Sequence, residues 1–177
     1  MSADLLFHVS EEPGISVFHP RAPPSPQAGV TADVVWAIDD DHLGNYLTPR
    51  DCPRVTFGRG PGTSDADAAR FLSGVTGRVI IIESAWLDRA LTTPIHVYAF
   101  QRGPHWRQHD PGAGYFTSAE PVFPVSVRRI DQPIAALLGR GCELRVCANL
   151  WTMIDLVTTS TLEFSIIRKA NALPRPA

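Results

Sequence analysis

Lysine is nearly missing from this chain of 177 residues, where Lys169 is the single lysine among 16 lysine and arginine side chains. The 18 acidic side chains leave a formal net charge of −2. A charge this near zero excludes a general electrostatic attraction to nucleic acid or anionic lipid. It leaves room for a local anion site, because arginine binds carboxylate and phosphate in a bidentate manner more readily than lysine does.

Cysteine is scarce as well, with Cys52, Cys142 and Cys147 as the three examples. The number is odd and the spacings match no zinc site, which argues against a disulfide framework and a structural zinc. Cys52 lies close in sequence to Arg50 and Arg54, and a nearby cation can lower a thiol pKa. A buried structural thiol is the alternative interpretation.

Long apolar runs are missing too, since no window approaches 18 continuous apolar residues. The first ten residues carry no basic segment of the kind that opens a secretory signal. We therefore expect a soluble, cytoplasmic protein without a membrane span.

The common signature motifs of nucleotide-binding proteins and hydrolases are not found. The chain contains no Gly-x-Gly-x-x-Gly, Walker A, His-Glu-x-x-His or Gly-x-Ser-x-Gly pattern. The glycine-rich stretch 58–64 is interrupted by Pro61, which makes it a poor phosphate loop. Any site must therefore be built from less regular patterns.

Many short apolar segments rich in β-branched residues predict strands, and the most strongly apolar, 78–83, predicts a strand buried on both faces. Short helices are expected between them, and no regular βαβ alternation is present. The sequence therefore predicts one mixed α+β domain over residues 1–173, with mostly antiparallel strands, peripheral helices and a disordered tail over 174–177. The expected strands are 5–9, 34–38, 54–57, 78–83, 95–100, 115–117, 125–130 and 143–146.

Helix signals are most explicit near the C-terminus. Ser160 and Glu163 have the spacing of a capping box, and the apolar residues behind them fall on one helical face, which predicts a C-terminal helix. That interpretation also accounts for Glu163 without a catalytic role. Asp131 is expected to cap a helix ending at a glycine, and residues 102–114 are expected to form a polar loop.

Two segments have a density of hydrogen-bonding groups that a core does not need. The first, 7–10, places His8 and Ser10 on the same face of a strand. A neutral histidine there can donate from one ring nitrogen and accept at the other, which suits a sugar hydroxyl or a carboxamide. A half-buried structural histidine is the alternative.

The second segment, 34–54, contains Arg50, which sits on a turn between Pro49 and Pro53. An arginine held in this way could clamp a phosphate, or it could form a structural contact with Asp51. Aromatic side chains that could stack on a ring, or belong to the core, are Trp36, Tyr46 and Tyr115.

A free carboxylate is expected at Glu120, in a turn before Pro121. Histidines at positions 105 and 109 have a metal-like spacing, but glycine and prolines around them favour a loop, and we expect no metal site. A metal-dependent hydrolase would have to use His8, His42, His105 and His109.

The strand segment with His8 and Ser10 resembles the histidine-bearing first strand of the ADP-ribosyltransferase superfamily. The run Tyr46-Leu47-Thr48-Pro49-Arg50 resembles the Tyr-x-x-Pro-Arg segment of its DNA-modifying toxins. The resemblance implies a split-sheet fold and NAD as the cofactor. It also implies that His8 and Ser10 contact the nicotinamide ribose or amide, and that Arg50 contacts the pyrophosphate. As a whole, the chain resembles an uncharacterised bacterial family.

The ADP-ribosyltransferase family usually has a glutamate at the start of a later strand. The expected position falls near Gly114 or Tyr115, neither of which is acidic, so Glu120 would be a displaced substitute. We therefore expect a protein that binds NAD or a related nucleotide. Its catalytic residues would be His8, Arg50 and Glu120, and a nucleic acid or protein acceptor is left open. The alternatives are a non-catalytic module that binds a nucleotide or a protein, and the metal-dependent hydrolase.

Overall fold

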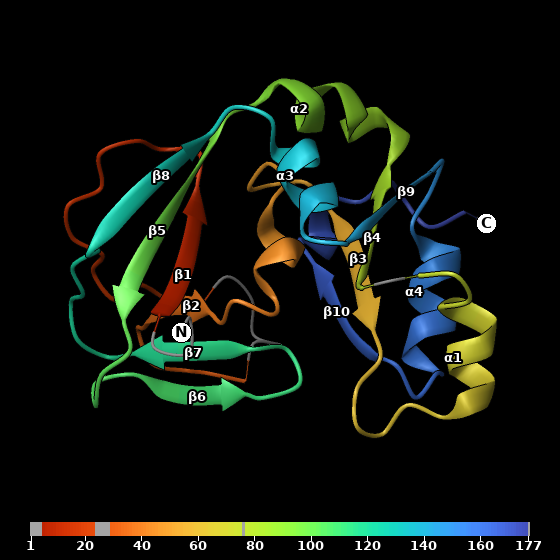
Figure 1. Cartoon of the computed structure of the whole chain (residues 1–177), viewed down its shortest axis with the longest axis horizontal. Helices are drawn as coiled ribbons and strands as arrows, with labels where there is room; N and C mark the ends of the chain where they lie inside the picture. Colours follow the sequence, from red (N-terminus) through yellow and green to blue (C-terminus); the bar gives the residue numbers. More distant parts are fainter. Residues whose placement is uncertain (1–4, 24–28, 76, 177) are drawn as a thin grey trace. The chain divides into compact units, whose positions relative to one another are not determined.

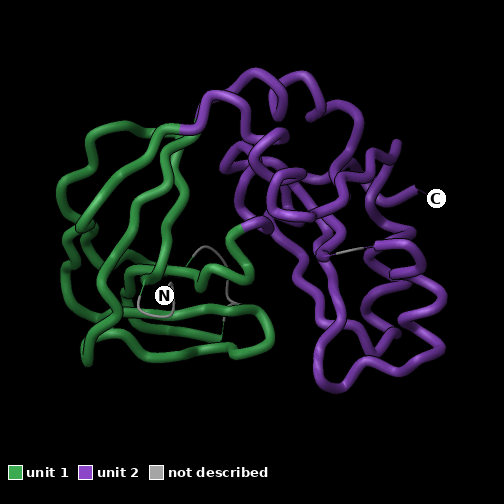
Figure 2. The backbone as a smooth tube through the Cα atoms, in the orientation of Figure 1, with its two compact units in different colours: residues 1–43, 95–129 green, residues 44–94, 130–177 purple. Residues whose placement is uncertain are grey.

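The computed structural model describes residues 5–23, 29–75 and 77–176. The chain forms two compact units, shown in Figure 2. Unit 1 consists of residues 1–43 and 95–129, and unit 2 of residues 44–94 and 130–177. Each unit contains one mostly antiparallel sheet with helical or irregular segments around it, which confirms the predicted α+β class. The extent of a single domain over 1–173 stays a prediction.

Unit 1 is built on a six-stranded sheet with the order β6-β7-β2-β1-β5-β8 (Figure 1). The long strand β5 pairs with β1 in one continuous antiparallel register, from Leu5 opposite Gln101 to Ser10 opposite His96. The strand bounds are β1 (Leu5–Ser10), β2 (Val35–Ile38), β5 (Ile95–Gln101), β6 (Arg107–Asp110), β7 (Tyr115–Ser118) and β8 (Ser126–Ile130).

The core of unit 1 lies on one face of this sheet. Phe18 packs against Tyr98 and Phe100 with ring centroids 5.1 and 5.2 Å apart. The backbone of Phe18 also exchanges two hydrogen bonds with Val122, at 2.9 and 3.0 Å, which fixes the proline-rich connection over this face. The face that carries Leu6, Tyr98 and Phe100 is therefore the covered one.

Unit 2 is built on a four-stranded sheet with the order β10-β3-β4-β9. Strand β4 is buried along its whole length, as its continuous β-branched run predicts. It pairs antiparallel with β3 and parallel with β9. The strand bounds are β3 (Arg54–Gly58), β4 (Val79–Glu83), β9 (Glu143–Cys147) and β10 (Glu163–Ile167).

Two helices cover one face of the four-stranded sheet (Figure 1). Phe71 from the helix Asp65–Phe71 and Ile154 from the helix Trp151–Thr158 pack with Phe57 and Ile81 in one apolar cluster. The helices in the described residues are α1 (Asp65–Phe71), α2 (Leu87–Thr92), α3 (Pro133–Gly139) and α4 (Trp151–Thr158), with the 3₁₀ turns η2 (Leu43–Tyr46), η3 (Ser84–Trp86) and η4 (Lys169–Asn171).

The predicted C-terminal helix is wrong. Residues Glu163–Ile167 form β10, which pairs with β3 from Glu163 opposite Gly58 to Ile167 opposite Arg54. Ser160 does not open a helix; its hydroxyl donates to the carbonyl of Val157 at 2.8 Å at the end of α4. The edge of β3 and the β-branched residues behind position 163 outweigh the local helix signal.

Two smaller predictions also fail. Helix α3 begins at Pro133 and its N-cap is Gln132, which makes no side-chain capping bond, so Asp131 is not the cap. Proline at the first helical position has its backbone angle already set for a helix. The segment 102–114 contains the strand β6, which pairs with β7 at the sheet edge. The carbonyl of Pro174 accepts a hydrogen bond from Asn149, just before α4, and Arg175 donates to Asp155 within α4.

Candidate functional site

The predicted site residues belong to two different units. His8, Ser10, Trp36, Tyr115 and Glu120 lie in unit 1, whereas Tyr46 and Arg50 lie in unit 2. Their convergence on one nucleotide stays a prediction, and each set is described within its own unit.

His8 lies in the middle of β1, and β2 is a direct neighbour of β1 through the pair Phe7 and Ile38. This confirms that the strand of His8 lies beside the strand of Trp36. The Nδ1 atom of His8 is 2.9 Å from the carbonyl oxygen of Trp36, so Nδ1 carries the hydrogen and Nε2 has the lone pair in the neutral ring. The imidazole also packs on Phe18 at 4.9 Å.

Ser10 and His8 lie on the same face of β1, because they are two residues apart in a strand. In the register with β5, Ser10 lies opposite His96 and His8 lies opposite Tyr98. The hydroxyl oxygen of Ser10 accepts a hydrogen bond from the backbone N–H of Glu12 at 3.1 Å. Ser10 is buried. The hydroxyl therefore fixes the chain where β1 ends.

Trp36 lies on the opposite face of the sheet from His8. The β2–β7 register places Trp36 opposite Thr117 and Ile38 opposite Tyr115, and Ile38 is also the partner of Phe7. The indole packs edge-on against Tyr115 at 5.8 Å and against His109 at 5.4 Å. Its Nε1 is buried and has no acceptor among the described residues. A ring stacked on Trp36 would lie on a different face from the His8 imidazole.

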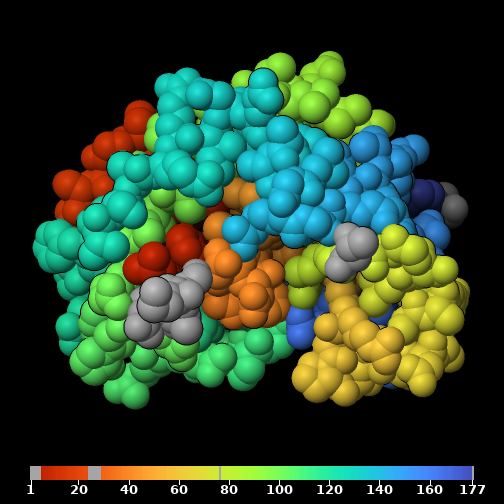
Figure 3. Space-filling model, in the orientation of Figure 1, coloured from red at the N-terminus to blue at the C-terminus, as the bar shows by residue number. Residues whose placement is uncertain are grey.

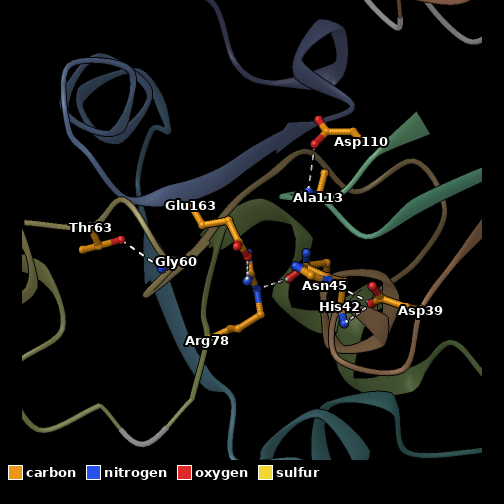
Figure 4. A network of polar contacts seen from close by, with 9 residues as sticks. All are labelled: Asp39, His42, Asn45, Gly60, Thr63, Arg78, Asp110, Ala113 and Glu163. Atoms are coloured by element: carbon orange, nitrogen blue, oxygen red, sulfur yellow. Dashed lines mark hydrogen bonds and ion pairs between the residues drawn. The ribbon is translucent and has the colours of Figure 1, made fainter. Parts of the chain in front are cut away.

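An aspartate–histidine pair follows directly after β2 (Figure 4). Asp39 Oδ1 is 2.7 Å from Nδ1 of His42 and also accepts the backbone N–H of His42 at 3.0 Å. The backbone N–H of Asp39 donates to the carbonyl of Gly114 at 3.0 Å. An aspartate on Nδ1 orients the ring and makes Nε2 the basic nitrogen, an arrangement also used in acid–base catalysis. His42 itself is buried.

Gly114 is required for this pair. Its φ is +67°, and a Cβ atom built there would lie 2.6 and 2.7 Å from the two carboxylate oxygens of Asp39. Any side chain would displace the carboxylate. The sequence singles out the segment with Asp39 and His42 but not the pair; the signal was the i, i+3 spacing of an aspartate that can close a turn on its own backbone.

In unit 2, Arg54 is a buried structural residue with 2% of its surface exposed. Its Nε donates to the carbonyl of Asn45 at 2.6 Å and its Nη1 to that of Cys52 at 2.7 Å. The guanidinium lies 5.1 Å from the centroid of the Tyr46 ring. Tyr46 therefore packs on a neighbouring arginine of its own segment.

The turn that carries Arg50 is fixed through its backbone. The carbonyl of Arg50 accepts from Nε of Arg168 at 3.2 Å, and that of Asp51 accepts from Nδ2 of Asn171 at 2.8 Å. Arg50 itself is exposed. A rigid backbone under an exposed guanidinium is compatible with the predicted clamp.

In unit 2, the carboxylate of Glu163 forms an ion pair with the guanidinium of Arg78 (Figure 4). Its Oε1 lies 2.5 Å from Nη1 of Arg78, and Nε of Arg78 donates to Oδ1 of Asn45 at 3.2 Å. The pair crosses above Gly58, which lies opposite Glu163 in the register and would bring a Cβ within 3.2 Å of the Arg78 guanidinium. The capping-box explanation of Glu163 is therefore wrong.

The sheet face around Glu163 is mixed, since the register places Ile80 and Ile82 of β4 on the same face as the polar residues. Strand alternation places Glu163 on the face away from Phe57 and Phe164, and Thr56 of β3 shares that face. Three buried atoms there or nearby have no hydrogen-bond partner among the described residues: Thr56 Oγ1, Asn45 Nδ2 and Arg78 Nη2. Buried polar atoms normally have partners, and an ordered water is one ordinary partner for such atoms.

The turn before Glu163 is held by a separate network. Thr161 donates to Oδ2 of Asp67 from its hydroxyl at 2.6 Å and from its backbone N–H at 2.7 Å. These bonds lower the pKa of Asp67 below its ordinary value. The backbone N–H of Ser64 donates to the Thr161 hydroxyl at 2.9 Å. Glu163 thus follows a turn fixed to the start of α1.

Cys52 and Glu120 have environments of different kinds. Burial raises the pKa of the Cys52 thiol to about 11, despite the opposing charge of Arg54, so this cysteine is a structural thiol. Glu120 is exposed in a turn closed by Ser118, whose hydroxyl accepts from the N–H of Glu120 at 3.1 Å and donates to its carbonyl at 3.0 Å.

Within residues 5–23, 29–75 and 77–176, no three histidine, cysteine or acidic side chains gather in a way that could hold a metal ion. The described histidines therefore provide no assembled centre for the hydrolase alternative. No helix in the same ranges has the length and apolar character to cross a bilayer.

The model of a family of unknown function (DUF6886) matches residues 7–172 of the chain. The chain belongs to this family. No curated protein and no solved structure matches the chain significantly. The DUF6886 region includes His8, Asp39, Arg50, Arg78 and Glu163.

Proposed function

We propose that the protein is an ADP-ribosyltransferase-like domain that binds NAD or a related nucleotide and uses Glu163 as its carboxylate. The observation that carries the proposal is the setting of Glu163, which begins the late strand β10 and is largely buried against Arg78, whereas Glu143 at the start of β9 is more exposed. The resemblance implies a glutamate at the start of a later strand, but the expected position near Gly114 or Tyr115 carries none. Glu163 therefore replaces Glu120 as the candidate.

The surroundings of Glu163 suit a positioned carboxylate. Arg78 binds one of its oxygens, and Asn45 orients Arg78. Cleavage of the bond to nicotinamide passes through an oxocarbenium-like transition state, in which a fixed carboxylate stabilises the developing positive charge.

The binding contacts follow from the resemblance. His8 and Ser10 are the expected contacts of the nicotinamide ribose or amide, and Arg50 that of the pyrophosphate. Trp36 and Tyr115 offer an aromatic surface in unit 1, whereas Tyr46 packs with Arg54.

The test is incubation with NAD followed by chromatography of released nicotinamide. We expect release by the wild-type protein and a rate lower by about 10²–10³-fold in Glu163→Gln, because one fixed electrostatic group is lost. Glu120→Gln is the matched control and should retain the wild-type rate. Absence of release, together with an unchanged melting temperature in millimolar NAD, would contradict the proposal, since saturation at 100 times Kd adds about 2.7 kcal/mol of stability.

A second candidate is a non-catalytic module that binds a nucleotide. It is favoured by the Glu163–Arg78 ion pair, because a carboxylate already bound to a guanidinium has less capacity to meet a substrate. This candidate predicts a rise in melting temperature with NAD or another nucleotide but no nicotinamide release. The same two measurements therefore separate the two functions.

A further inference from the structure

An exposed apolar stripe lies at one end of the six-stranded sheet. Phe123, Val125 and Val127 have 69%, 61% and 52% of their surface exposed. Phe123 and Val125 line the same hollow, and Val127 follows in β8, beyond a bend at Val125. In the space-filling view the teal atoms of this part of the chain lie at the surface (Figure 3). Scattered exposed apolar residues are ordinary, but a contiguous row is characteristic of a binding surface.

The stripe coincides with an open sheet edge. Strand β8 is the last strand of the order, with β5 as its neighbour on the inner side. The N–H of Val125 donates to the carbonyl of Ala99 in β5 at 2.8 Å. Because successive residues of a strand direct their N–H groups to opposite sides, the backbone groups of Ser126 and Arg128 face away from β5. An edge of this kind can pair with a further strand.

A hollow of about 210 Å³ lies beside the stripe. Phe123 and Val125 line it together with Phe100 and Val122, and His105 and Glu120 also border it. Its apolar walls suit an apolar side chain from a strand laid along β8. The hollow therefore provides a pocket next to the exposed side chains of Phe123 and Val125.

The charge on β8 identifies the class of partner. Ser126, Val127, Arg128 and Arg129 are all exposed, so the strand presents guanidinium groups beside the apolar row. Pairing with a second copy about a two-fold axis centred on Arg128 would place this arginine opposite itself, and like charges in directly opposed positions are destabilising. An acidic side chain at that position would instead form a cross-strand ion pair.

We propose that the edge of β8 binds an extended segment of a partner protein in which apolar and acidic residues alternate. The partner strand pairs with the backbone of Ser126 and Arg128. Its apolar side chains lie along Phe123, Val125 and Val127, and its acidic side chains lie on the face of Arg128. This interaction is independent of nucleotide binding.

The probe is a blocked decapeptide of alternating valine and glutamate, tested with the full chain against a decapeptide of alternating valine and lysine. We expect the valine–glutamate peptide to bind at least tenfold more tightly in fluorescence anisotropy. We also expect it to slow hydrogen exchange of the Ser126 and Arg128 amides at least tenfold, because these N–H groups become donors to the added strand. Equal affinity for the two peptides, or unchanged exchange at both amides, would overturn the proposal.

Two variants sharpen the test. Arg128→Glu should reverse the preference in favour of the valine–lysine peptide. Ser126→Pro should weaken binding of the valine–glutamate peptide at least tenfold, because it removes an outward N–H, whereas Ser126→Ala should bind as the wild type does. An unreversed preference in Arg128→Glu argues against the proposal even if the proline variant does not fold. A dimer in sedimentation that Val127→Lys dissociates would assign the edge to a second copy instead.

Discussion

The carboxylate of Glu163 lies 2.5 Å from Nη1 of Arg78, although the two residues are 85 positions apart in the chain. The contact joins the start of β10 to the residue before β4, and it passes above β3 at Gly58, where no side chain intervenes. The ion pair therefore links three strands of unit 2.

The first prediction concerns the strength of this pair. The side chains of Arg78 and Glu163 are 13% and 18% exposed, so screening by water is limited. A double-mutant cycle with Arg78→Gln and Glu163→Gln should give an interaction free energy of about 2 kcal/mol, in the range of hydrogen bonds to charged groups. Urea unfolding of the four proteins measures it, and an interaction near zero would show that the pair contributes nothing net.

The second prediction concerns Gly114. Gly114→Ala should lower the free energy of unfolding by about 1–3 kcal/mol, because alanine is strained at a φ of +67° and its Cβ would displace Asp39. Gly139→Ala is the matched control. A Cβ at Gly139 meets no atom within 4 Å, and alanine favours the end of α3, so this variant should be as stable as the wild type or slightly more so. Equal losses in the two variants would argue against the Gly114 contact.

The third prediction concerns Asp67 and pH. The pKa of Asp67 is lowered mainly by the hydroxyl of Thr161 and then by its backbone N–H. The folded protein therefore favours the ionised carboxyl. Its stabilising effect is present above the ordinary pKa of aspartate and is lost as the pH falls through the lower folded value.

Thr161→Val tests this assignment, because it removes the hydroxyl and keeps the backbone donor. The carboxyl resonance of Asp67, followed by NMR titration, should shift its midpoint to higher pH in the variant. Ser64→Ala should move the midpoint less, since Ser64 contributes a smaller effect. A midpoint that stays in place in Thr161→Val would exclude the threonine hydroxyl as the principal cause.

The fourth prediction concerns Cys52. A thiol with a pKa of about 11 has roughly one thiolate in a thousand molecules at pH 8, so its alkylation is slow. In the folded protein, iodoacetamide should modify Cys142 and Cys147 before Cys52, because Cys52 is fully buried and the other two are partly exposed. Peptide mass spectrometry measures the order. Denaturation should make the three rates similar, and early labelling of Cys52 in the folded state would contradict the burial.

The strands were predictable because their signal is local. The β-branched run that becomes β4, and the mixture of β-branched and aromatic residues that becomes β5, identify these strands without any tertiary information. The segment after Ser160 was not predictable in this way, since its helix signal is outweighed by pairing of Ile166 and Ile167 with β3, far away in the sequence.

The candidate site likewise combines residues that have a local sequence signal with contacts that have none. The polar segments that contain His8, Asp39 and Arg50 are apparent from composition. The contacts of Glu163 with Arg78 and of Asp39 with the backbone of Gly114 depend on chain crossings that no local pattern encodes. A buried arginine such as Arg54 is likewise invisible in the sequence, because its partners are backbone carbonyls.

The interleaving of the two units has a consequence for synthesis on the ribosome. Unit 1 needs both residues 1–43 and residues 95–129, with the first half of unit 2 inserted between them. Pairing of β1 with β5 therefore cannot be complete until residue 101 has emerged, and pairing of β2 with β7 cannot be complete until residue 118 has emerged. No single continuous fragment of the gene encodes either unit alone, because each unit consists of two separated stretches of the chain. Such late, long-range pairing is intrinsically slow, and the nascent chain exposes its apolar strands throughout the delay.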